Sequence, residues 1–231
     1  MGKRKLSNYF QSIISCIIII IIPLYAFCSG NNEFEELSFL LTFMIKSGDE
    51  EPRSINYSDQ FIRLTAEDNF RLYIEPIQNA YIYIFIYDES GNLALVFPEI
   101  YSVFDTEYYY KMGYFIPDEE DWFYLEKDSN NLEIYIIAAS KRLNKLEKLA
   151  SKYISFIKDV DLNPKDIIKS RETVLNEIKT LRQQHSFFKG IKENLIPISG
   201  SFRGLNEKMK GNALVVNSEK FYSKTIRIYQ E

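Results

Sequence analysis

The sequence predicts a mainly β protein, an antiparallel β-sandwich with two amphipathic helices inserted before its C-terminal strands. Aromatic residues, which favour strands, make up 15% of the 231 residues. The runs at 81–87 and 132–139 are apolar on both faces, so one open sheet would leave a side of each uncovered. Near residue 144 the period of the apolar positions changes from two to that of a helix. Two packed sheets with helices satisfy all three observations.

The first part of the folded region reads as strands separated by turns. Apolar residues alternate at 39–45, and a loop over 46–52 leads to an edge strand within 54–65. A meander follows, with strands at 70–75, 80–87 and 93–97. Residues 88–91 predict a type I turn in which Gly91 takes a positive φ. We expect this meander to be the centre of the fold.

A long loop and more short strands follow Pro98. Residues 100–111 lack a clear period, and we expect this loop to be a functional surface. Strands at 114–117 and 122–125 flank an acidic turn, and a strand at 132–139 ends this β region.

Two helices are predicted over about 144–188. Asn144, with Glu147 three residues later, indicates the first N-terminus, and Asn163-Pro164 indicates the second. Both helices are amphipathic, so we expect them to pack against the sheet rather than to bind a partner. Glycines 200, 204 and 211 then predict a loop, and strands are expected at 213–216 and 220–229.

The first 28 residues read as a signal peptide before a single domain at 37–231. Basic residues 3–5 precede an apolar run of about 15 residues, shorter than the roughly 20 needed to cross a bilayer. The protein is therefore expected to be exported, to the periplasm or the extracellular space. The alternative is an uncleaved N-terminal membrane anchor.

Processing of this segment has two readings. Ala26 and Cys28 suit the small-residue positions of a signal-peptidase cut before Ser29. Alternatively, residues 24–28 resemble a bacterial lipobox, with the bulky Phe27 before a lipidated Cys28. Phe27 favours the first reading, and membrane attachment is expected only if Cys28 is lipidated or the signal is uncleaved. Cys16 lies within the signal, so the mature fold has no intramolecular disulfide.

Net charge argues against nucleic acid as a partner. The full chain carries −4, which becomes −7 when Lys3, Arg4 and Lys5 leave with a signal that contains no acid. Such a protein repels phosphate backbones.

Catalytic, nucleotide-binding and metal-binding patterns are weak. His185 is the only histidine, and we expect no catalysis by it. The glycines between 200 and 211 lack the ending of a phosphate loop, and no zinc spacing is present, so no cofactor and no metal are expected. The turn from Asp118 to Asp121 holds four consecutive acids, which could bind calcium or supply two carboxylates for glycoside hydrolysis. A solvated acidic turn is the simpler interpretation.

Exposed aromatics are the better candidates for binding. They could form a stacking platform for a sugar or an apolar patch for a protein partner. The alternative is that they cover the sheet as a second core layer. The candidate residues are Tyr101, Tyr108, Tyr109, Tyr110 and Trp122.

Residues 60–140 resemble the domain of unknown function 4384 family. The resemblance is carried by the stretches 68–74, 79–84, 91–93, 96–98 and 114–117. It implies a bacterial β-sandwich module of a kind that is often exported and has no established reaction. We therefore expect an exported, non-enzymatic binding or interaction module of the bacterial envelope, with an unknown protein or carbohydrate partner. The alternatives are a hydrolase that uses the acidic turn and a lipid-anchored surface lipoprotein.

Overall fold

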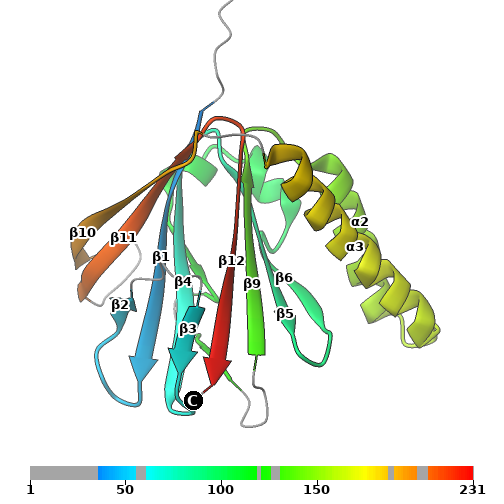
Figure 1. The fold of residues 1–231 in the computed structure, drawn as a ribbon, viewed down its shortest axis with the longest axis horizontal. Helices are drawn as coiled ribbons and strands as arrows, with labels where there is room; N and C mark the ends of the chain where they lie inside the picture. The colour runs from blue at the N-terminus through cyan, green and yellow to red at the C-terminus, as the bar shows by residue number, and fades with distance from the viewer. Residues whose placement is uncertain are drawn as a thin grey trace, which may run out of the picture. The chain divides into compact units, whose positions relative to one another are not determined.

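The chain folds into two packed β-sheets and two α-helices, which confirms the predicted mainly β fold (Figure 1). The structure, a computed structural model, describes residues 36–55, 61–118, 121–125, 131–186, 190–201 and 208–230. All of these belong to one unit, Glu35–Glu231. The predicted signal, with Ala26 and Cys28, lies outside the described residues.

The larger sheet has seven strands within the described residues, in the order β10-β11-β2-β1-β4-β7, with β8 also paired to β4. Its strands are β1 (Leu37–Ser47), β2 (Arg53–Ile55), β4 (Asp68–Gln78), β7 (Tyr114–Ile116), β8 (Phe123–Tyr124), β10 (Lys192–Ser201) and β11 (Lys208–Ser218). All pairings are antiparallel except the short contact between β2 and β11.

The smaller sheet has five described strands in the order β3-β12-β9-β5-β6. They are β3 (Phe61–Leu64), β5 (Tyr81–Asp88), β6 (Leu93–Phe97), β9 (Asn131–Ala139) and β12 (Phe221–Gln230). β12 lies between β9, to which it is antiparallel, and β3, to which it is parallel. A strand late in the sequence is therefore internal to the sheet.

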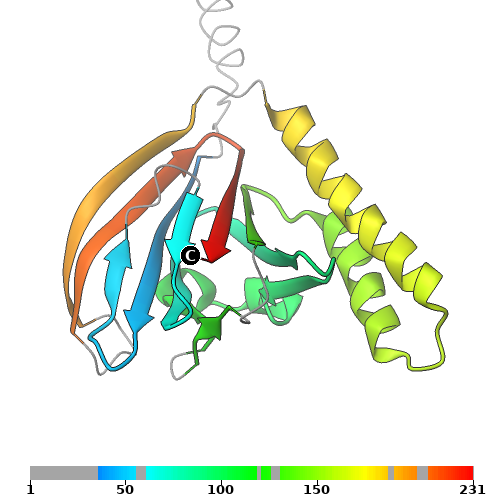
Figure 2. The same ribbon diagram turned by 60° about the horizontal axis from the view of Figure 1, so that its bottom comes forward.

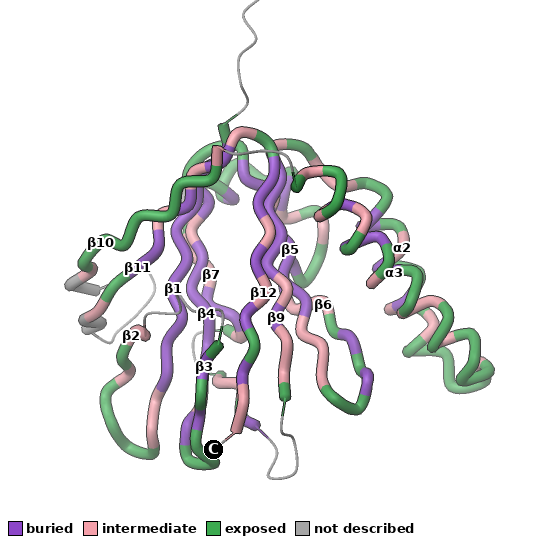
Figure 3. Tube along the Cα trace, viewed as in Figure 1, coloured by how far each residue is buried: buried purple, intermediate pink, exposed green. Residues whose placement is uncertain are grey.

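The main core lies between the two sheets. Alternate residues of β1 and β4 belong to this core, and the opposite sheet contributes several isoleucines. Figure 3 shows that the buried stretches run along the strands of both sheets. Phe39 of β1 meets Tyr222 of β12 edge to face, with ring centroids 5.4 Å apart. Each large apolar side chain buried here contributes about 1.5–3 kcal/mol.

The helices cover the other face of the smaller sheet (Figure 2). α2 (Asn144–Lys158) buries Leu146, Ala150 and Tyr153, and α3 (Pro164–His185) buries Val174, Ile178 and Leu181. The side chain of Asn163 accepts a hydrogen bond from the N–H of Lys165 at 3.0 Å, as its sequence position predicts. Leu143, not Asn144, is the N-cap of α2.

Several elements differ from the sequence-based expectation. The predicted meander is divided, because β4 pairs with β1 in the larger sheet whereas β5 and β6 belong to the smaller one. The stretch expected as one edge strand contains β2 and β3, which lie in different sheets. Residues 192–201 form β10, and Gly200 and Gly211 lie within strands rather than in the expected loop.

Candidate functional site

A groove lies where one edge of each sheet meets the other. It runs between β6 of the smaller sheet and β7 and β8 of the larger one, and its cavity measures about 410 Å³. We call it the edge groove. It is lined by Val96, Phe97, Pro98, Glu99, Ile100, Val103, Tyr114, Phe115, Ile116, Pro117, Asp118, Asp121 and Phe123.

Two prolines mark the strand ends beside the edge groove. β6 ends at Phe97 before Pro98, and β7 ends at Ile116 before Pro117, and both of these peptide bonds are cis. Proline has no N–H to donate to a ladder, so it suits the end of an edge strand. The chain between them runs through the 3₁₀ turns η1 (Tyr101–Asp105) and η2 (Tyr109–Lys111) and so crosses from one sheet to the other.

The floor of the edge groove is apolar and its rim is acidic. Phe97 and Ile116 are buried, and the rings of Phe97 and Tyr114 lie 5.1 Å apart. Above them, Ile100 is 64% exposed. The carboxylates of Glu99, Asp118 and Asp121 belong to exposed residues.

The acidic turn forms part of this rim. The N–H of Asp121 donates to the carbonyl of Asp118 at 2.9 Å, and both residues line the groove. Glu119 and Glu120 lie outside the described residues. Apolar side chains surrounded by carboxylates suit a ligand with an apolar body and positive charge.

The structure places the predicted aromatic residues in three different settings. Tyr109 is fully buried, and its hydroxyl donates to the carbonyl of Ala80 (2.8 Å) and accepts from the N–H of Ile82 (3.1 Å). It therefore holds the connection between β4 and β5. Burial raises the pKa of the Tyr109 hydroxyl well above its ordinary value.

Tyr101 is half-buried, whereas Tyr108 and Tyr110 are exposed, at 59% and 38%. Burial raises the pKa of Tyr101 to about 12, with the Glu147 charge as the next cause. Tyr110 packs against Tyr109 at 4.9 Å, and burial raises its pKa to about 12 as well. None of these tyrosines lines the edge groove.

Trp122 is not next to the tyrosines. It lies on the outer face of the larger sheet, where the guanidinium of Arg71 is 4.2 Å from its ring and 4.7 Å from that of Phe115. The five aromatics therefore do not form one stacking platform.

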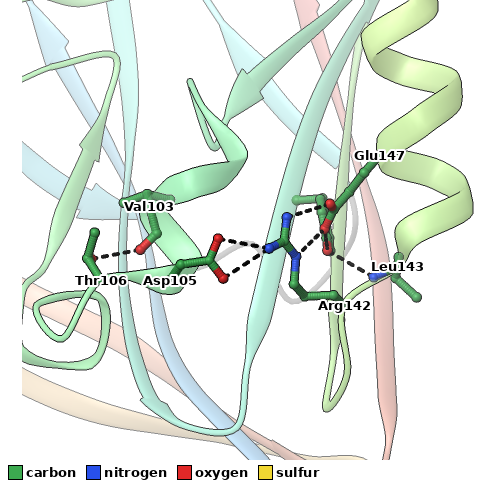
Figure 4. A network of polar contacts seen from close by, with 7 residues as sticks. Val103, Asp105, Thr106, Arg142, Leu143 and Glu147 are labelled. Carbon is green, nitrogen blue, oxygen red and sulfur yellow. Dashed lines mark hydrogen bonds and ion pairs between the residues drawn. The ribbon is translucent and has the colours of Figure 1, made fainter.

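A polar network centred on the buried Glu147 joins α2 to β5 and η1 (Figure 4). Glu147 accepts hydrogen bonds from the Tyr83 hydroxyl (2.6 Å) and from Nε and Nη2 of Arg142 (3.0 and 2.7 Å). Arg142 Nη1 also contacts both oxygens of Asp105 at 3.1 Å. Burial, and then the bond to Glu147, raises the pKa of Tyr83 above its ordinary value. The network fixes the start of α2.

The sequence did not indicate the residues that build the groove floor or those that form the polar network around Glu147. The available signal for the floor was the pair of strand-ending dipeptides, Phe97-Pro98 and Ile116-Pro117. Nothing in the sequence indicated that Tyr83, Arg142 and Glu147 meet.

The geometry adds no support for catalysis by His185 or for a metal site among the described residues. The ring of His185 is stacked on Phe221 at 4.4 Å. In the part of the chain that the structure describes, no group of three or more His, Cys, Asp and Glu side chains is placed to hold a metal ion. Neither described α-helix is long and apolar enough to cross a bilayer.

Searches of protein-family models, of curated proteins and of solved structures found no match to this chain.

Proposed function

We propose that the protein is an exported, non-enzymatic interaction module of the bacterial envelope whose edge groove binds an extended peptide segment of a partner protein. The observation that carries the proposal is the coincidence of an apolar floor, three rim carboxylates and two sheet edges in one cavity. An edge strand offers backbone groups to an added strand, and pockets beside it select alternate side chains.

The negative charge of the rim favours a peptide that carries basic side chains. Glu99, Asp118 and Asp121 favour Lys or Arg, while Phe97, Ile100 and Ile116 favour aliphatic side chains between them. An acidic segment would be repelled. The proposed partner segment therefore alternates apolar and basic residues.

Family membership and export are part of the proposal. The stretches that resemble the domain of unknown function 4384 family fall on β4 to β7, and two of these strands, β6 and β7, flank the edge groove. Export rests on the first 28 residues. Fractionation of producing cells tests it, since a protein found only in the cytoplasm would contradict it.

Binding of a defined peptide tests the groove. The full chain is titrated with an extended peptide in which Val alternates with Lys, and affinity is measured by fluorescence polarisation. Replacing Glu99→Gln, Asp118→Asn and Asp121→Asn together should weaken binding about tenfold, at about 0.5 kcal/mol for each exposed charge. Salt should weaken wild-type binding and affect the triple variant less.

A matched control distinguishes the effect of the groove carboxylates on affinity from the effect of the protein's net charge. Glu67→Gln, Glu89→Gln and Glu172→Gln remove three exposed carboxylates that do not line the groove and should leave affinity unchanged. A peptide N-methylated at alternate amides should bind poorly, because it cannot pair with an edge strand. Equal losses in both triple variants would contradict the proposal.

The same variants address the hydrolase alternative. Asp118 and Asp121 share the groove, so a hydrolytic role would use these two carboxylates. Cleavage of a peptide or glycan by the wild type, lost in Asp118→Asn or Asp121→Asn, would replace the binding proposal with the enzymatic one.

A further inference from the structure

β10 forms the far edge of the larger sheet. It has ten residues, and among the described residues its only paired neighbour is β11 (Figures 1 and 2). Natural edge strands are usually short, bulged or charged, because a long free edge pairs readily with another chain. β10 is long and its ladder with β11 is regular.

Apolar side chains are exposed on both faces of β10. Residues 192–197 are all exposed, with Leu195 at 47% and Ile196 at 37%. Leu195 is paired with the core residue Leu214, so it lies on the inner face, and Ile196 lies on the outer one. A partner strand would therefore cover apolar surface on both sides.

The direction of the backbone groups follows from one hydrogen bond. The N–H of Asn212 donates to Ser54 Oγ at 2.6 Å, toward β2 and away from β10. Asn212 is paired with Pro197, so the backbone groups of this pair point away from each other. By alternation, Glu193 and Leu195 present their N–H and C=O groups to the free edge, and Pro197 presents only a C=O.

We propose that β10 pairs with β10 of a second copy, antiparallel, about a two-fold axis at Asn194. This register places Glu193 of one copy opposite Leu195 of the other, so their outward N–H and C=O groups bond in both directions. Pro197 falls opposite Ile191, at the end of the ladder, where its missing N–H interrupts nothing. Asn194 faces Asn194, and the two amides can bond to each other.

Neighbouring registers are less favourable. An axis at Glu193 would oppose two carboxylates, which destabilises a strand pair. An axis at Leu195 would place Pro197 opposite Glu193, inside the ladder, and Asn194 opposite Ile196. The register at Asn194 avoids both faults.

The edge strand is held in position before any partner arrives. The carboxylate of Glu193 accepts from the Tyr222 hydroxyl at 2.7 Å and from Lys224 Nζ at 3.0 Å, both on β12. These bonds connect β10 to the smaller sheet. A fixed edge loses less conformational entropy when it pairs.

Disulfide trapping tests the register. In the full chain with Cys16→Ser and Cys28→Ser, Asn194→Cys should form a covalent dimer under mild oxidation. Its pair is of the non-hydrogen-bonded kind, with Cα atoms about 4.5 Å apart, which a disulfide can span. Lys192→Cys, which would face Ile196, should form no disulfide-linked dimer, whereas Lys192→Cys combined with Ile196→Cys should cross-link.

Solution mass tests the interface without cysteines. Light scattering over a dilution series should show a dimer, and Leu195→Lys or Ile196→Lys should raise the concentration for half-dimer at least about tenfold. Ile168→Lys, at an exposed isoleucine of α3, should not. A wild-type monomer throughout, equal dimers in all variants, or equal cross-linking of Asn194→Cys and Lys192→Cys would overturn the proposal.

Discussion

Glu147 shows how one buried carboxylate can organise its surroundings. Its oxygens are bonded by Tyr83 and Arg142, and the N–H of Leu143 donates to the same Tyr83 hydroxyl at 3.0 Å. Tyr83→Phe removes the donor to a charged acceptor and leaves the Leu143 N–H without this bond. We expect a loss of about 1.5–3 kcal/mol in the free energy of unfolding, measured by urea denaturation.

Tyr124→Phe is the matched control. Tyr124 is 70% exposed, so removal of its hydroxyl should change stability by less than about 0.5 kcal/mol. Glu147→Gln combined with Tyr83→Phe should cost less than the two single changes added together, because the residues share a bond. Strict additivity would show that the hydrogen bond contributes nothing.

Local interactions were predictable at this scale and distant ones were not. The Asn163-Pro164 cap involves neighbours in the sequence, and the structure confirms it. Tyr83 and Glu147 are 64 residues apart, so no local pattern could pair them. In the sequence, Tyr109 likewise looks like part of an exposed tyrosine run. In the structure its hydroxyl donates a hydrogen bond to the carbonyl of Ala80, in the connection after β4.

At the scale of elements, α3 is fastened to the turn between β5 and β6 through one glycine. Gly91 has a φ of 82°, and its carbonyl accepts a hydrogen bond from Arg171 of α3. A Cβ at this position would lie 2.9 Å from Arg171 Nη1. Gly91→Ala should therefore cost the backbone strain of about 1–2 kcal/mol and weaken the contact with α3.

Gly48→Ala separates these two effects. Gly48 also has a positive φ, of 51°, but a Cβ there would meet nothing within 4 Å. Thermal denaturation should show a larger loss of stability for Gly91→Ala than for Gly48→Ala. Equal losses would mean that the Arg171 contact does not stabilise the fold.

Strands were easier to predict than their partners. The sequence indicated β4, β5 and β6 nearly within their observed bounds, because each has a strong apolar pattern. It did not show that the chain changes sheets between β4 and β5, where the ladder with β1 shifts register near Pro76 and Asn79 has a φ of 44°. β10 was missed because its exposed side chains leave no alternation that burial would impose.

At the scale of the whole molecule, stability should fall on acidification. Burial, with a further effect of Lys220, lowers the pKa of His185 below its ordinary 6.5. Burial opposes ionisation of Asp68 and Glu133, but bonds from Ser47 and Thr65 and from Arg227 and Tyr135 outweigh it, so both pKa values are lowered from 3.8 and 4.5. The unfolded chain therefore binds these protons at higher pH than the folded protein.

Because each of these pKa values is lower in the folded protein than in the unfolded chain, each group stabilises the fold only while it is deprotonated. His185 contributes stability above pH 6.5 that is lost as the pH falls toward its folded pKa, and the two carboxylates add a second loss below about pH 4.5. Melting temperatures followed by circular dichroism should drop in these two ranges. His185→Gln should flatten the first decline and leave the second unchanged, and an unchanged first decline would contradict the assignment.

The edge groove depends on the whole molecule, because strands of both sheets form it. The loop at 100–111 was expected to be functional and the acidic turn only as an alternative, and the start of the loop lines the edge groove together with Asp118 and Asp121. The groove itself exists only because β6 and β7 are edges of different sheets that lie side by side, a relation that no periodicity in the sequence encodes. Trp122 is separated from the tyrosines for the same reason.

The internal position of β12 constrains when the protein can fold. Residues 227–230 pair with 61–64, and Arg227 bonds to Glu133, 94 residues earlier. A nascent chain that stops before residue 221 has an open edge on β9 and an unattached β3. Such long-range pairing makes folding slow, so the smaller sheet cannot be completed until the ribosome has synthesised β12. For the export proposed above, this late pairing would keep the polypeptide in the unfolded state that a secretion channel accepts.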